Sequence, residues 1–362
     1  MPGLYIHVPF CLSKCPYCDF YSVKPGASAL TAYTDAVCRV LSDSKHASKP
    51  VDTVYFGGGT PVLLGGKNLS LILETAAKHF RFTEPEVTIE ANPAAIAADG
   101  LASLRLSGFN RVSFGVQSGA DEELAALGRL HTAAQARQSI LDAETAGFSD
   151  ISADLMLGIP HQTAQSLNRS LDFFGALPLT HVSAYMLKIE QNTAFYERGV
   201  VIDEDALADI YLSTVERLSA FGFAQYEISN FAKNGAVSRH NLKYWTLGEY
   251  LGIGPSAHSF IGGKRFFIPR GLKSFLQAED PMSLAVPDGD GGGFEEYAML
   301  RLRLCEGLNL AEAAERYSVD TDKIAKKTKP LTGLVKMENG IISLTSRGFL
   351  LSNAVTAALL YD

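Results

Sequence analysis

The stretch HVPFCLSKCPYCDFYS, residues 7–22, places three of the chain's five cysteines within eight residues. Cys11, Cys15 and Cys18 have the spacing C-x-x-x-C-x-x-C. A structural zinc site wants four ligands, often as two C-x-x-C pairs, and no second pair follows here. Three closely spaced thiolates instead suit a [4Fe–4S] cluster whose fourth iron is open to another ligand. A chance grouping or an adventitious zinc site is the alternative interpretation at this point.

The whole chain has 362 residues, which suits one barrel-sized domain with an appendage. Its net charge of -7 argues against a nucleic acid as the main partner, because such partners usually demand a basic face. It shows neither an apolar run of about 18 residues nor a signal peptide, so we expect a cytoplasmic protein with reduced thiols. An odd number of cysteines with a tight trio predicts a metal site and two bystanders, Cys38 and Cys305.

Short β-rich runs alternate with amphipathic helical segments over roughly the first 200 residues. The runs are 4–9, 52–59, 86–93, 111–118, 150–160 and 181–190. Strand and helix in alternation predict an α/β fold with a parallel sheet. Loops that follow such strands cluster at the C-terminal face of a β/α barrel, where we expect the chemistry.

The pattern changes after residue 200. The stretch VPDGDGGGF, residues 286–294, has the composition of a linker. Beyond it, two helical segments precede two short strands joined by the turn signal ENG, and a last helix follows. We therefore predict a barrel over 1–230, an extension over 231–285 and a small winged-helix-like α+β domain over 294–362.

Polar residues appear at or near the ends of the later strands. The second strand ends in GGGTP, residues 57–61, whose glycines bring backbone groups close to a ligand. Glu90, Gln117 and Asp154 follow on three successive strands. Burying such groups unpaired costs about 1–3 kcal/mol each. Each one alone could be a core hydrogen-bonding residue, but one ligand across the barrel mouth would satisfy all three.

These motifs together resemble the HemN/HemW group of radical S-adenosylmethionine (SAM) proteins, the oxygen-independent coproporphyrinogen oxidase and its relatives. The resemblance rests on LYIHVPFCLSKCPYCDF, VYFGGGTP, EANP, RVSFGVQS, LGRLH, DLMLGIP and YLGIGPSAHS. It implies a partial (β/α)6 TIM-like radical SAM barrel, with Cys11, Cys15 and Cys18 on the cluster and SAM on the unique iron. The implied SAM contacts are Tyr5, Tyr17, Gly58, Gly59, Thr60, Glu90, Gln117, Arg129 and Asp154.

Some of these assignments stay open within the resemblance. In the oxidase, several of the contacts serve a second SAM, so the resemblance does not say which molecule each residue touches. Arg129 has an alternative interpretation as a solvated charge at the barrel rim, and Tyr5 as an ordinary strand residue.

Two departures separate this chain from the oxidase. The oxidase has a cysteine two residues after its third cluster cysteine, and here that residue is Phe20. The oxidase also has an extension before its first strand, whereas here the first strand begins close to Met1. Both departures favour the HemW branch, which implies a haem chaperone rather than a decarboxylase.

The stretch RHNLKYW, residues 239–245, matches the H-N-x-x-Y-W motif associated with haem in that branch. His240 would be an axial haem ligand, Asn241 would orient it or bond a propionate, and Tyr244 and Trp245 would pack on the macrocycle. The alternative is a core histidine with core aromatic residues. His258 is a second, weaker ligand candidate, and His7, next to the cluster loop, is expected to support that loop.

The leading hypothesis is therefore a haem chaperone, and the rival is an enzyme. The chaperone would bind haem and pass it to client proteins, under the control of the cluster and SAM. Respiratory enzymes as clients, a homodimer and a peripheral association with a membrane are further expectations. The enzyme would use a 5′-deoxyadenosyl radical for the oxidative decarboxylation of coproporphyrinogen III. Whether SAM is cleaved and whether haem is held covalently stay open.

Overall fold

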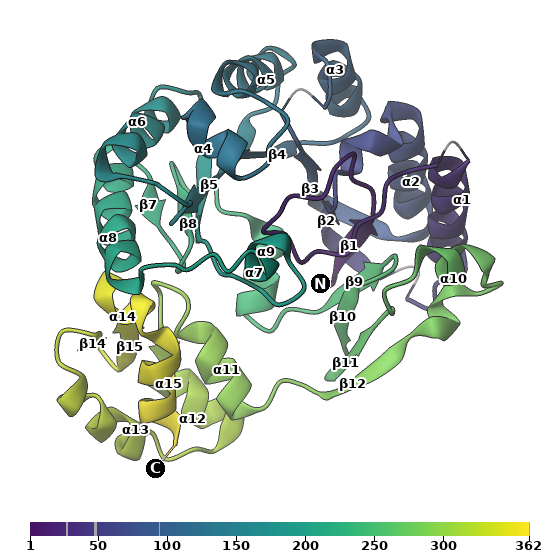
Figure 1. Ribbon diagram of the computed structural model, residues 1–362. Helices are drawn as coiled ribbons and strands as arrows, with labels where there is room; N and C mark the ends of the chain where they lie inside the picture. The colour runs from purple at the N-terminus through teal and green to yellow at the C-terminus, as the bar shows by residue number, and fades with distance from the viewer. Residues whose placement is uncertain (27, 47–48, 94, 362) are drawn as a thin grey trace.

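The computed structural model describes residues 1–26, 28–46, 49–93 and 95–361 (Figure 1). Its centre is one curved sheet with the strand order β12-β11-β10-β9-β1-β2-β3-β4-β5-β6-β8-β7. The strands from β1 to β6 are all parallel to their neighbours in this series. They are β1 (Gly3–Val8), β2 (Pro50–Gly58), β3 (Arg81–Ala91), β4 (Arg111–Gln117), β5 (Asp150–Leu157) and β6 (His181–Met186).

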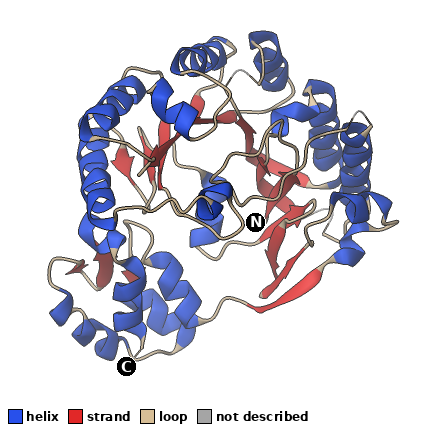
Figure 2. Cartoon of the chain, viewed as in Figure 1, coloured by secondary structure: helices blue, strands red, loops and turns tan. Residues whose placement is uncertain are grey.

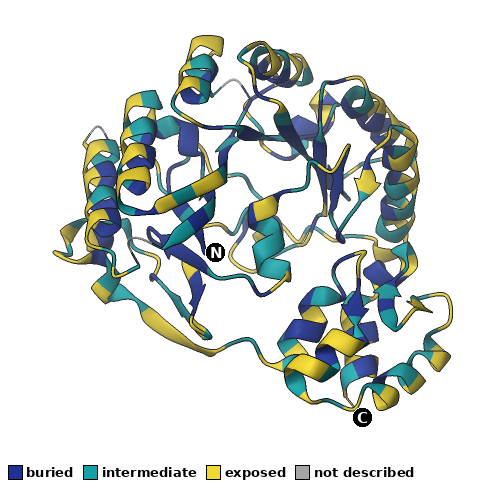
Figure 3. Cartoon of the chain, turned by 180° about the vertical axis from the view of Figure 1, so that it is seen from behind, coloured by how far each residue is buried: buried dark blue, intermediate teal, exposed yellow. Residues whose placement is uncertain are grey.

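Helices cover the outer face of this curved sheet (Figure 2). They are α1 (Ala29–Ser42), η1 (Pro61–Leu64), α2 (Gly66–His79), α3 (Ala98–Leu106), α4 (Asp121–Ala126), α5 (Ala133–Thr145), α6 (Ala164–Gly175) and α8 (Glu204–Ala220). The short helix α7 (Ala194–Glu197) lies instead against the cysteine loop, where the Phe195 N–H donates to the Pro16 carbonyl at 2.9 Å. Local sequence fixes several of their starts. Thr132 and Gln135 form a capping box at α5, so two backbone N–H groups without helical partners are satisfied. The central parallel strands are largely buried, and the outward sides of the helices are exposed (Figure 3).

The segment after α8 extends the sheet at both of its ends. It contains β7 (Ala224–Gln225), β8 (Asn230–Ala232), α9 (Arg239–Trp245), β9 (Tyr250–Ile253), β10 (His258–Ile261), β11 (Lys264–Phe267), α10 (Leu272–Gln277), η2 (Pro281–Leu284) and β12 (Val286–Asp290). Strand β8 pairs antiparallel with β6, and β9 pairs parallel with β1. Between them the chain forms α9, which lies on the inner side of the curved sheet (Figure 1).

The glycine-rich linker prediction is wrong for its first half. Residues 286–290 form the edge strand β12, which pairs antiparallel with β11 across a register shift. All five residues of β12 are exposed. An edge strand tolerates proline and glycine because one of its sides needs no ladder hydrogen bonds, so linker composition did not exclude a strand here.

A small C-terminal domain follows. Its elements are α11 (Phe294–Arg301), β13 (Leu308–Asn309), α12 (Leu310–Tyr317), α13 (Thr321–Lys327), η3 (Lys329–Leu331), β14 (Val335–Glu338), β15 (Ile341–Leu344), α14 (Ser346–Leu350) and α15 (Ser352–Leu360). Strands β14 and β15 form the predicted hairpin. Its turn residues Asn339 and Gly340 have φ values of 50° and 76°, as a tight two-residue turn requires.

None of the helices in the part of the chain that the structure describes is long and apolar enough to cross a membrane.

Candidate functional site

The loop after β1 carries the three clustered cysteines, and backbone hydrogen bonds hold it against the end of β2. The Cys11 N–H donates to the Val23 carbonyl at 3.1 Å. The Gly59 N–H donates to the Val8 carbonyl at 2.8 Å, and the Thr60 N–H to the Phe10 carbonyl at 2.7 Å. The cysteine loop and the GGGTP turn therefore form one unit.

The third glycine of the turn, Gly59, shows why this contact demands glycine. A Cβ atom at Gly59 would lie 2.6 Å from the Phe10 carbonyl oxygen, closer than any side chain tolerates. Gly58 has a φ of 107°, in the region that favours glycine, and packs against the His7 ring. A side chain at Gly59 would push the turn away from the cysteine loop, and one at Gly58 would clash with His7 of β1.

Most of the predicted SAM contacts meet the cysteines in a pocket of about 440 Å³ at this end of the barrel. The predicted residues that line it are Cys11, Cys15, Cys18, Tyr17, Gly58, Gly59, Thr60, Glu90, Gln117, Arg129 and Asp154. Tyr5 does not line it. The Tyr5 ring lies deeper in the barrel, where its hydroxyl hydrogen-bonds His7 Nδ1 at 3.0 Å.

Arg129 ties the pocket wall to the cysteine loop rather than extending into solvent. Its Nη2 donates to the Gly115 carbonyl at 2.6 Å and to Asn92 Oδ1 at 2.5 Å, and its Nη1 to Cys15 Sγ at 3.5 Å. Asn92 donates in turn to Thr60 Oγ1 at 2.9 Å. Asn92 is not among the predicted site residues, although it lies in the EANP motif at residues 90–93.

Two of the carboxyl groups that line the pocket, those of Asp154 and Glu90, have raised pKa values. Burial and the neighbouring Glu90 raise the pKa of Asp154 to about 7, although a hydrogen bond from Ser183 opposes the shift. Burial also raises the pKa of Glu90, against hydrogen bonds from the Tyr55 hydroxyl and the Gly58 N–H. A cationic group entering between these carboxyl groups would favour their ionised forms.

The H-N-x-x-Y-W residues lie on α9, apart from this pocket. His240 is fully buried, and both of its ring nitrogens have partners. Nδ1 hydrogen-bonds Thr53 Oγ1 at 2.9 Å, and Nε2 hydrogen-bonds the Tyr244 hydroxyl at 3.0 Å. A metal could take Nε2 only after the contact with Tyr244 opens.

The other residues of the motif face different neighbours. Asn241 lines a chamber of about 30 Å³ inside the barrel, together with Arg111 and Asp154. The Arg303 guanidinium lies over the Trp245 ring, with its Cζ atom 4.7 Å from the centre of that ring. His258 is exposed and stacks on Phe267 with ring centres 5.2 Å apart.

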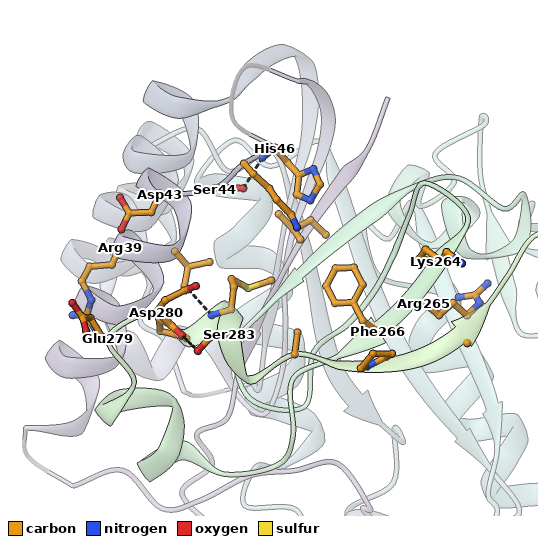
Figure 4. Close-up of a pocket in the computed structure, with 18 of the residues that line it drawn as sticks. Arg39, Asp43, Ser44, His46, Lys264, Arg265, Phe266, Glu279, Asp280 and Ser283 are labelled. Atoms are coloured by element: carbon orange, nitrogen blue, oxygen red, sulfur yellow. Dashed lines mark hydrogen bonds between the residues drawn. The ribbon is translucent and has the colours of Figure 1, made fainter.

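A larger cavity of about 820 Å³ lies outside the barrel, between the end of α1 and the strands β11 and β12 (Figure 4). None of the predicted site residues lines it. Its charged lining balances four cations against four carboxylates, namely Arg39, Lys45, Lys264 and Arg265 against Asp43, Glu279, Asp280 and Asp290. The smaller pocket thus gathers the three cysteines and most of the predicted SAM contacts, but none of the predicted haem residues.

Comparison with known proteins places this geometry in a family. The model of the Radical SAM superfamily matches residues 5–174, and that of the HemN C-terminal domain matches residues 294–351. The heme chaperone HemW of Mycobacterium tuberculosis is 37% identical, over 99% of this chain and 94% of the relative. This chain belongs to the HemW family of radical SAM proteins. The heme chaperone HemW of Escherichia coli is 38% identical to it, over 84% of this chain and 83% of the relative.

The HemW-family chain also matches the solved structure of E. coli coproporphyrinogen III oxidase, HemN. The TM-score is 0.85, with 23% identity, over 99% of this chain and 90% of that one. At this identity the likeness concerns the fold alone. It confirms the predicted partial radical SAM barrel with a small C-terminal α+β domain.

The HemW-family pocket passes a chemical test for SAM, which carries an ammonium, a carboxylate, a sulfonium and ribose hydroxyls. In the described part of the chain, the buried atoms Gln117 Oε1 and Arg129 Nε have no hydrogen-bond partner. Gln117 also has a φ of 75°, which is strained for a residue with a side chain. One free acceptor, one free donor and two carboxyl groups therefore fit the polar groups of SAM.

The cysteines fit a cluster better than a single ion. Among the described residues, no three histidine, cysteine or acidic side chains converge as a group that could hold one metal ion. A [4Fe–4S] cluster makes a different demand, because its three protein thiolates bind three separate irons. Burial and the neighbouring Cys15 and Cys11 thiols raise the pKa of Cys18. Bound iron would lower this pKa, because a metal ion favours the thiolate that coordinates it.

Proposed function

We propose that this chain is a haem chaperone, which binds haem and transfers it to client proteins in dependence on a [4Fe–4S] cluster and SAM. The observation that carries the proposal is the nearly full-length match to relatives named heme chaperone HemW. The pocket that gathers the cysteines with the glycine turn and two carboxyl groups supports the dependence on both cofactors.

The residues have separate roles in this proposal. Cys11, Cys15 and Cys18 would hold the cluster. Glu90, Asp154 and Gln117 would accept hydrogen bonds from SAM, Arg129 would donate to its carboxylate, and Tyr17 and the turn from Gly58 to Thr60 would enclose it. When bound, the cluster supplies an open iron for SAM and an electron for reductive chemistry. Tyr5, which does not line the pocket, would support it indirectly through its hydrogen bond with His7.

The haem motif would work in a second state of α9. His240 would ligate haem iron through Nε2, with Asn241, Tyr244 and Trp245 around the macrocycle. In the present arrangement Nε2 hydrogen-bonds Tyr244, and the ring is fully buried. Haem loading through His240 therefore requires α9 to leave its place inside the curved sheet.

The wider setting of the protein is proposed from its composition. The acidic net charge of -7 and five unpaired cysteines suit the cytoplasm, where thiols stay reduced. The clients would include respiratory enzymes. The chaperone would act as a homodimer and would associate peripherally with a membrane to reach them.

The alternative is a radical SAM oxidase that decarboxylates coproporphyrinogen III. The fold of E. coli HemN, with its TM-score of 0.85, is the observation in its favour. Phe20 opposes it, because the position that carries a cysteine in the oxidase bears a phenyl ring that is 66% exposed at the pocket.

One anaerobic preparation separates the two functions. The reconstituted protein is offered haem and, in parallel, coproporphyrinogen III with SAM and a reductant. We expect a [4Fe–4S] absorbance, a Soret shift on haem titration and no decarboxylated product. Formation of that product at enzymatic rates would overturn the chaperone proposal.

Variants of the same preparation test the residue roles. Replacing Cys11, Cys15 and Cys18 together by Ala should abolish cluster iron, whereas the matched control Cys38→Ala with Cys305→Ala should retain it. His240→Ala should weaken the Soret shift. Haem binding as tight as in the parent protein would remove His240 from the list of ligands.

A further inference from the structure

A continuous path of contacts joins the haem motif on α9 to the proposed SAM pocket. The His240 ring stacks on the Tyr55 ring of β2, with ring centres 5.1 Å apart and planes 29° apart. The Tyr55 hydroxyl donates to Glu90 Oε1 at 2.7 Å. The other carboxylate oxygen, Oε2, accepts from the Gly58 N–H at 3.1 Å, within the glycine turn.

Each end of this path is anchored. At the α9 end, the His240 N–H donates to Glu86 Oε1 at 3.0 Å and the ring nitrogens bond Thr53 and Tyr244, so the ring cannot turn freely. At the pocket end, Glu90 lines the pocket beside the three cysteines. Tyr55 itself lines only the inner chamber and does not line the pocket.

We infer that Tyr55 is a positioning residue for SAM, which holds the Glu90 carboxylate in place and is itself held by the stacked His240 ring. This inference rests on the proposed SAM site. A carboxylate has about four acceptor positions, so Glu90 can keep the bonds from Tyr55 and Gly58 and still accept from a ligand. Without the Tyr55 hydroxyl, Glu90 keeps one anchor and rotates more freely.

The inference gives the buried histidine a function in the haem-free state. While α9 is in place, His240 supports Tyr55 and the pocket is ordered for SAM. When α9 moves to load haem, the stack is lost and Glu90 loses its support. SAM and haem should therefore oppose each other's binding.

The test measures the SAM dissociation constant of the cluster-bearing protein by anaerobic equilibrium dialysis. Tyr55→Phe, which keeps the ring and removes the hydroxyl, should raise the dissociation constant about tenfold, the usual effect of losing one hydrogen bond to a charged group. Cluster absorbance and iron content should stay at the parent level. Tyr211→Phe is the matched control. The buried Tyr211 hydroxyl donates to the Ile228 carbonyl at 2.8 Å, and Tyr211 does not line the pocket.

A double-mutant cycle separates positioning from a general loss of stability. His240→Ala alone should also weaken SAM binding, although His240 does not line the pocket. Added to Tyr55→Phe, it should cause little further loss, because both variants interrupt one path. Equal SAM affinity in Tyr55→Phe and the parent, or fully additive losses, would overturn the inference. A parent protein that binds no SAM would instead refute the proposed function.

Discussion

Alternate residues of each barrel strand face opposite sides of the sheet, and this two-residue period determines what the pocket is made of. On β5, Ile151, Ala153 and Leu155 belong to the apolar core. Ser152 and Asp154, between them, line the polar chamber inside the barrel. A barrel filled for stability alone would carry branched apolar side chains on its inner face. This interior instead carries polar side chains, which suits the proposed SAM site above it.

Asp154 should make the stability of the SAM-free protein depend on pH. Its pKa is about 7 in the folded chain and about 3.9 when unfolded, so folding binds a proton between these values. The stability that this group contributes is full below the unfolded value and is lost as pH rises through about 7. Asp154→Asn removes this pH-dependent loss of stability, because the amide side chain does not ionise. We expect the variant to be more stable than the parent at pH 8, by roughly 1–3 kcal/mol.

Urea denaturation of cluster-free protein at pH 8 and pH 5 measures this effect. The gain from Asp154→Asn should shrink by more than half at pH 5, where the buried carboxyl group is protonated. Asp150→Asn, at the start of the same strand, is the control and should change stability little at either pH. A gain of equal size at both pH values would contradict the electrostatic cause.

At the scale of elements, the sequence predicts those parts whose signal is local. The six parallel strands are visible as β-rich runs, and the cysteine loop and GGGTP turn as contiguous motifs. The position of α9 is not visible, because its contacts join distant residues. Thr53 and His240 are 187 residues apart in the chain, and Glu86 and His240 are 154 apart. The path through Tyr55 could not be predicted for the same reason.

The turn after β2 and the cysteine loop should act as one element when Gly59 is changed. In Gly59→Ala the new Cβ meets the Phe10 carbonyl oxygen at 2.6 Å, and a backbone atom cannot move aside as a side chain does. Because Phe10 precedes Cys11, relief of this clash shifts the first cluster ligand. We expect at least a twofold loss of iron per chain after reconstitution and about 1–3 kcal/mol of destabilisation.

Iron and sulfide analysis, with far-ultraviolet circular dichroism to verify folding, checks this expectation. Gly26→Ala is the matched control, because, apart from its chain neighbours, no atom of the described residues lies within 4 Å of a Cβ built at that exposed glycine. If folded Gly59→Ala protein binds as much iron as the Gly26→Ala protein, the turn does not position the cluster loop.

At the scale of the whole molecule, α9 is the element that three regions share. It contacts the barrel interior through His240 and the N-terminus through Lys243, which pairs with Asp52 at 2.6 Å and bonds the Met1 carbonyl at 2.9 Å. Its last residue, Trp245, lies against Arg303, which follows α11. A movement of α9 would therefore alter the barrel and its contact with the C-terminal domain together.

Such sharing has a thermodynamic consequence that can be measured. If haem loading displaces α9, SAM should raise the dissociation constant of haem by the same factor by which haem raises that of SAM, because coupling between two sites is reciprocal. We expect a factor of about 5 to 20 in the parent protein. In Tyr55→Phe the factor should fall towards one, since α9 no longer supports Glu90. Paired titrations, each with and without the other ligand, measure both factors. Equal affinities with and without the second ligand in the parent would show that α9 does not connect the sites, and SAM would then have to influence haem release through another element.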